Sequence, residues 1–218
     1  MQMLMAGGWM MLPILACSVI GMTIVFERLL QFRGTGKTQE ASQMVALSEK
    51  GKFTDALALA DQHAQPLLRV LAAGIMNREE LPDKAMEAAG LAELARLKRG
   101  LSVLDTIITL GPLLGLLGTI VGMIDSFGIM AESGLGQPHA VTGGIAEALI
   151  CTAAGIFVAV TTLIPYNYFH AKVEQMTERI EQYATQLESA LAAQVRHPHH
   201  QSTYASVEHQ APIQHQAP

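Results

Sequence analysis

The sequence has few charged residues, and long parts of it have none. Only 15% of its 218 residues are charged, whereas 50% are hydrophobic. No Asp, Glu, Lys or Arg occurs in Met1 to Phe26, in Thr106 to Ile124 or in Ala148 to Phe169. A helix that crosses a bilayer needs ~20 mostly apolar residues. These absences exclude an ordinary soluble domain and predict an all-α membrane protein with three transmembrane helices.

Cysteine and N-terminal positive charge are also scarce. The two cysteines, Cys17 and Cys151, fall inside predicted spans, where small packing residues are expected rather than a disulfide or a metal site. A signal peptide carries positive charge before its apolar stretch, but the first basic residue here is Arg28. We therefore expect a retained anchor. The sequence indicates no cofactor, and the lack of a basic stripe with interleaved aromatic residues argues against nucleic-acid binding.

The basic residues that are present predict the orientation. Of the 14 Lys and Arg residues, eleven lie from Arg28 to Arg99 and three lie from Lys172 onward. Positive charge stays on the cytoplasmic side of a membrane protein. The N-terminus is therefore predicted to be outside, the loop after the first span and the C-terminus inside, and the short turn between spans two and three outside.

The chain divides by composition into seven parts. Apolar residues at helical spacing predict amphipathic helices between spans one and two, over Gln39 to Glu49, Phe53 to His63, Leu67 to Asn77 and Asp83 to Arg99. The last of these is expected to run into span two as one rod, and span three to continue as a long cytoplasmic helix. The predicted parts are transmembrane helix 1 (1–32), a cytoplasmic helical region (33–102), transmembrane helix 2 (103–130), a periplasmic turn (131–142), transmembrane helix 3 (143–170), a cytoplasmic helix (171–196) and a disordered His- and Gln-rich tail (197–218).

One acidic residue, Glu147, is the only charged residue between Gly143 and Phe169. A charge in hydrocarbon costs roughly 2.5 to 3.5 kcal/mol on insertion scales, so such residues usually face the bundle interior or a wet path. Burial favours the neutral form of a carboxyl group, which makes a proton the natural ion for this site. Because Glu147 is near the outer end of its span, snorkelling to the surface or a structural hydrogen bond remain alternatives.

Small residues in span two predict close helix packing. Their spacing of four lets helices approach closely, in the pairs Gly111 with Gly115 and Gly118 with Gly122. Pro112 is expected to bend the helix. Span two is therefore predicted to be an interior packing or pore-lining helix, whereas span one, with its bulky apolar residues, is predicted to face lipid.

Other polar residues of the spans have two interpretations each. Thr119, Thr152, Thr161 and Thr162 are candidates for a polar path, but a membrane threonine often bonds only its own backbone. Asp105 and Asp125, at the two ends of span two, are expected to be solvated or capping residues, with a role in the ion path as the less favoured alternative. Glu27 and Arg28 are expected to form an interfacial charge pair. In the tail, metal binding by histidines is conceivable, but a solvated segment is the expected state.

Two of these stretches resemble a known family. Residues 110–124 (LGPLLGLLGTIVGMI) and 144–155 (GIAEALICTAAG) are similar to the signature helices of the MotA/TolQ/ExbB proton-channel family. The Phe26-Glu-Arg sequence at the end of span one is similar to its counterpart there. The resemblance covers most of residues 9 to 190. Three predicted spans argue against the four-span flagellar branch.

The resemblance implies a subunit of the bacterial inner membrane that forms a homopentamer around a dimeric, single-span ExbD- or TolR-like partner and works with a TonB- or TolA-like protein. It implies a proton pathway of Glu147, Thr119 and Thr152. Cys151 departs from the usual alanine, and Thr161 and Thr162 stand where apolar residues or proline are common. The residues expected to line the pore or pack the helices are Gly111, Pro112, Gly115, Gly118, Gly122, Cys151 and Gly155.

The expected function is that of a proton-channel subunit of an ExbB-ExbD-like motor, which uses the proton motive force to energise TonB-dependent outer-membrane transport. One alternative is a TolQ-like motor for outer-membrane integrity and division. Another is a passive oligomeric scaffold in which Glu147 only specifies packing. An intramembrane enzyme would need a nucleophile or metal set, and the sequence has no recognisable one.

Overall fold

The computed structural model describes residues 8–32, 38–63, 65–133 and 138–196, and the regular structure in these ranges is helical. Three of its helical stretches are long and apolar enough to cross a membrane, which confirms the predicted fold class. The helices are α2 (Met11–Phe32), α3 (Gln39–Glu49), α4 (Phe53–Gln62), α5 (Pro66–Met76), α6 (Pro82–Lys98), α7 (Leu101–Ser133) and α8 (Pro138–Arg196).

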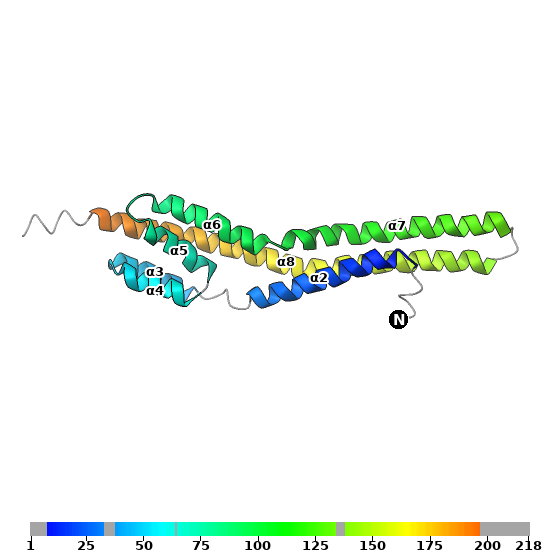
Figure 1. The fold of residues 1–218 in the computed structure, drawn as a ribbon, viewed down its shortest axis with the longest axis horizontal. Helices are drawn as coiled ribbons and strands as arrows, with labels where there is room; N and C mark the ends of the chain where they lie inside the picture. The colour runs from blue at the N-terminus through cyan, green and yellow to red at the C-terminus, as the bar shows by residue number, and fades with distance from the viewer. Residues whose placement is uncertain (1–7, 33–37, 64, 134–137, 197–218) are drawn as a thin grey trace, which may run out of the picture. The chain divides into compact units, whose positions relative to one another are not determined.

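The chain divides into two compact units. The first unit contains residues 1–33 and 97–174, and the second contains residues 34–96 and 175–218. In the first unit, α2 packs against α7, and the first part of α8 lies beside both helices (Figure 1). At one end, Phe32 of α2 stacks on Phe169 of α8 with ring centroids 5.6 Å apart. The bulky side chains exposed on α2, as expected of a lipid-facing helix, include Leu12, Val19, Met22 and Phe26.

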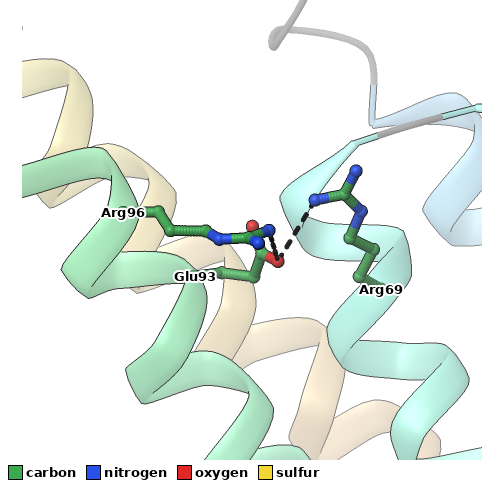
Figure 2. Close-up of polar contacts among 3 residues, drawn as sticks. All are labelled: Arg69, Glu93 and Arg96. Atoms are coloured by element: carbon green, nitrogen blue, oxygen red, sulfur yellow. Dashed lines mark hydrogen bonds and ion pairs between the residues drawn. The ribbon is translucent and has the colours of Figure 1, made fainter.

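The second unit has an ordinary apolar core. Helices α3, α4 and α5 pack on one another, and α5 also contacts α6 and the last part of α8. The fully buried side chains of this core include Met44, Leu68, Leu71, Ile75 and Leu187. Figure 2 shows its main ion-pair group, in which Glu93 of α6 accepts from Arg69 of α5 and Arg96 of α6, each at 3.3 Å.

The bounds of the amphipathic helices agree with the sequence prediction to within one residue. Helix α3 has the predicted bounds, α4 differs by one residue at its C-terminal end, and α5 and α6 differ by one residue at each end. The expectation of an unbroken rod into span two is wrong, because α6 ends at Lys98 and α7 begins at Leu101. Gly100 has a φ of +88°, a conformation that glycine adopts without a steric penalty.

Spans two and three are both longer than predicted at the connection between them. Helix α7 reaches Ser133 and α8 begins at Pro138, so residues 131–133 and 138–142 of the predicted turn are helical, and residues 134–137 lie outside the described residues. A proline fits the first position of a helix, where its missing N–H costs nothing. Helix α8 then continues without a break to Arg196, as predicted for span three. The predicted tail, residues 197–218, lies outside the described residues.

Candidate functional site

Glycines of α7 form the surface on which α8 packs. A Cβ atom added at Gly115 would lie 2.9 Å from the Cα atom of Thr152, and one added at Gly122 would lie 2.9 Å from the Cβ atom of Ala148. A Cβ atom at Gly118 would collide with the Cys151 sulfur. Side chains at these positions would force the helices apart. The close approach predicted from the glycine spacing is therefore confirmed, and it lies within one chain.

The same contact continues toward the other end of α7. A Cβ atom at Gly111 would lie 2.8 Å from the carbonyl oxygen of Gly155, and one at Gly155 would collide with the carbonyl oxygen of Gly111. Helix α7 is continuous through Pro112, which is half-buried. Gly111 and Gly155 thus act as a pair that brings the two backbones into contact.

Thr152 joins the two helices by a hydrogen bond. Its hydroxyl donates to the carbonyl oxygen of Gly115 at 2.8 Å. In contrast, the Thr119 hydroxyl donates to Leu116 of its own helix at 2.7 Å, and Thr162 donates to Val158 at 2.8 Å. Thr119 and Thr162 therefore bond to the backbone of their own helix, as is common for membrane threonines. Thr152 instead bonds to the backbone of the neighbouring helix.

Cys151 belongs to the apolar packing of the first unit. Its side chain is buried in a cluster with Met10, Ile14, Ile107 and Val158. Cys151 and Cys17 are both free thiols. Cys151 therefore fills the space that Gly118 leaves, in keeping with its predicted packing role.

Glu147 is exposed in the single chain, so its expected burial within an assembly stays a prediction. Its carboxylate lies against Gly8, just before α2, where an added Cβ atom would collide with Oε1. Gly8 has a φ of +66°, which a glycine adopts readily. Glu147 also lines a pocket of about 300 Å³ between the start of α2, α7 and α8.

Two further polar residues of α7 line this pocket: Ser126, which the sequence analysis did not single out, and Asp125, which it expected to be a solvated or capping residue. Ser126 is buried and donates to the Gly122 carbonyl oxygen at 2.7 Å, with its hydroxyl against Gly144. The helical spacing of Asp125 from Gly122 was the available signal, since residues three apart share a face. Asp105 and Asp125 are both exposed, but Asp105 is not among the residues of this pocket.

Arg28 lies at the opposite end of the first unit and is more than an interfacial charge. Its side chain is buried, and Nη1 donates to the carbonyl oxygen of Leu97, near the end of α6, at 3.3 Å. A Cβ atom at Gly100 would lie 3.2 Å from Nη2. A guanidinium that donates to the last carbonyl groups of a helix caps it favourably. Arg28 therefore stabilises the turn between α6 and α7, whereas Glu27 is exposed.

Known proteins resemble this chain over most of its length. The model of the MotA/TolQ/ExbB proton channel family matches residues 62–182. The putative biopolymer transport protein ExbB-like 3 of Synechocystis sp. is 33% identical over 195 residues, which are 84% of this chain and 91% of that protein. The Tol-Pal system protein TolQ of Pseudomonas aeruginosa is 29% identical over 208 residues, 85% of this chain and 87% of that protein.

The chain belongs to the MotA/TolQ/ExbB proton channel family.

The part that matches the MotA/TolQ/ExbB family model contains the whole of α7 and the part of α8 that packs on it. It therefore includes the glycine contact, Thr152 and Glu147. The family is one of proton channels and not of enzymes. Among the described residues, no group of three or more His, Cys, Asp or Glu side chains is placed to hold a metal ion. Names of both the ExbB and the TolQ kind occur among the relatives.

Proposed function

We propose that this chain is the proton-channel subunit of an ExbB-ExbD-like motor in a bacterial inner membrane, which uses the proton motive force to energise TonB-dependent outer-membrane transport. Glu147 carries the proton in this proposal. Thr119 and Thr152 contribute polar groups to its path. The N-terminus is periplasmic and the C-terminus is cytoplasmic.

The observation that carries the proposal is an exposed carboxylate on an apolar helix. Around Glu147, Leu149 of α8 is 63% exposed and Ile124 of α7 is 64% exposed, as suits a surface that meets lipid or another chain. A carboxylate left against lipid would cost several kcal/mol. Another copy of the chain, a partner helix or a water-filled path would shield Glu147 from lipid, and an assembly provides the first two.

A homopentamer around the single-span helices of an ExbD- or TolR-like dimer would supply that cover. A proton that crosses 100 mV releases ~2.3 kcal/mol. This is about the free energy of a few hydrogen bonds between membrane helices, at ~0.6 kcal/mol each. One proton can therefore bias a small movement between the pentamer and its partner, which a TonB- or TolA-like protein would carry outward.

The runner-up is a TolQ-like motor for outer-membrane integrity and division. It is favoured by the TolQ relative, which matches 85% of this chain. The ExbB-like relative covers a similar share at a higher identity, 33% against 29%, and for this reason we place the ExbB-like function first.

The decisive experiment replaces Glu147 by Gln, which keeps the shape of the side chain and removes its ability to lose a proton. The variant should assemble with the single-span partner, as measured by co-purification and native mass, but should not drive energised transport or conduct protons in proteoliposomes. Glu27→Gln is the matched control, because Glu27 is an exposed glutamate at the other end of the first unit. It should retain both properties.

Normal energised transport by Glu147→Gln would refute the motor. Loss of the assembly, with the partner no longer co-purifying, would support the passive scaffold instead. To separate the two motor systems, the wild-type chain and its partner are expressed in bacteria that lack either the TonB-linked or the Tol-linked motor. Restored import with unrestored envelope integrity is the result expected of the ExbB-like function.

A further inference from the structure

Asp125 lies on the same face of α7 as the glycines that meet α8. Gly118, Gly122, Asp125 and Ile129 follow one another at spacings of four, three and four, which places them on one side of a helix. All four line the pocket that contains Glu147. The two acidic residues therefore come from different helices and border one cavity.

The register of the two helices places Asp125 one turn beyond Glu147. Gly122 contacts Ala148, whereas Ser126, one turn later on α7, contacts Gly144, one turn earlier on α8. The helices are thus antiparallel, and Glu147 is level with Gly122. Asp125 lies about 5 Å nearer the connection between α7 and α8, which is one helical turn. In the proposed orientation this is the outer side.

The pocket has room for water between the two carboxylates. A volume of about 300 Å³ would hold several water molecules, since each occupies ~30 Å³ in the liquid. Ser126 and Trp9 also line the pocket. Proton transfer between side chains can proceed through a water molecule that is hydrogen-bonded to both.

We propose that Asp125 is a second proton-carrying residue, which passes protons through the pocket water between the outer end of the first unit and Glu147. An Asp125 oxygen takes up a proton from water on the outer side and releases it to pocket water, from which Glu147 receives one. No other bond is made or broken. This inference rests on the proposed function, because it extends the path of Glu147.

The test compares proton flux in proteoliposomes for the wild-type complex and for Asp125→Asn, Asp125→Glu and Asp105→Asn. We expect Asp125→Asn to lower the flux roughly tenfold, below the 10²-fold or more that a principal acid–base group contributes. Asp125→Glu should restore most of it, because it keeps a titratable carboxylate in the pocket. Asp105→Asn is the matched control on α7, and its flux should equal that of the wild type. Native mass checks that each variant is assembled.

Three outcomes would overturn this inference. The first is a flux for Asp125→Asn that equals the flux for Asp105→Asn. The second is an equal loss in Asp125→Asn and Asp125→Glu, which would assign Asp125 a structural role. The third is a further loss when Asp125→Asn is added to Glu147→Gln, because two groups on one path should not act independently. Normal flux in Glu147→Gln would instead refute the proposed function itself.

Discussion

The contacts that stabilise the first unit internally differ from those that stabilise the second unit. In the first unit, α7 and α8 meet through glycines, with the Thr152 hydroxyl bonded to Gly115. In the second unit, large side chains such as Leu71 and Leu187 fill a fully buried core, and Glu93 holds two arginines. The difference follows from the solvent expected around each unit.

Different kinds of contact stabilise helix packing in lipid and in water. In water, removing apolar area from solvent stabilises a core by about 25 cal/mol per Å². In lipid that driving force between helices is absent, and close backbone approach, dispersion and hydrogen bonds must hold the helices together. The same chain can therefore be destabilised in the second unit by making a side chain smaller, and in the first unit by making one larger.

The largest change in stability is expected in the core of the second unit. Leu71 of α5 is fully buried, so Leu71→Ala removes a buried side chain and leaves a cavity. Such changes cost ~2 to 5 kcal/mol. Thermal unfolding of the purified chain, followed by circular dichroism, should show a lower midpoint. Leu91→Ala is the control, because Leu91 is 64% exposed, and its midpoint should change little. Equal shifts for the two variants would contradict a core at Leu71.

An enlarged side chain is the corresponding test of the first unit. Gly115→Ala places a methyl group 2.9 Å from the Thr152 Cα atom, where only a movement of backbone can make room. Overpacking of this kind costs ~1 to 3 kcal/mol. Gly128→Ala is a matched control on the same helix, because a Cβ atom there meets nothing within 4 Å. The measurement is the midpoint of unfolding by a denaturing detergent.

The difference in unfolding midpoint between the two glycine variants measures the effect of packing against α8 alone. Alanine favours a helix over glycine by up to ~1 kcal/mol, and this gain is shared by both substitutions. Gly128→Ala should therefore be neutral or slightly stabilising, and Gly115→Ala should be destabilising. If Gly115→Ala were as stable as Gly128→Ala, the close contact between α7 and α8 would be wrong.

Local patterns predicted most of the fold. Apolar spacing and the prolines at positions 66 and 82 located α4, α5 and α6 to within one residue, since these signals act over a single helical turn. The glycine spacing predicted the close approach of α7 and α8. The break at Gly100 was missed, because a glycine within a helical pattern is tolerated as often as it ends a helix.

The candidate site was less predictable, because exposure depends on chains that one sequence does not contain. The sequence predicted Glu147 as the central carboxylate, and the described residues leave it exposed. Asp125 was assigned to the solvated end of span two, and its place in the Glu147 pocket depends on the register of two helices. Register is a tertiary property that the pattern of one helix does not encode.

The smallest expected change concerns Thr152, whose hydroxyl crosses from α8 to α7. Thr152→Val keeps the volume and removes this hydrogen bond, which should lower the free energy of unfolding by ~0.6 kcal/mol, the average for such bonds between membrane helices. Thr109→Val is the control, because the hydroxyl of Thr109 on α7 donates to the carbonyl oxygen of Asp105 in its own helix. Measuring detergent unfolding and proton flux on both variants separates two roles. We expect a lower midpoint and a lower flux for Thr152→Val. An unchanged midpoint would contradict the packing role argued from its geometry, and an unchanged flux would contradict its proposed place on the proton path.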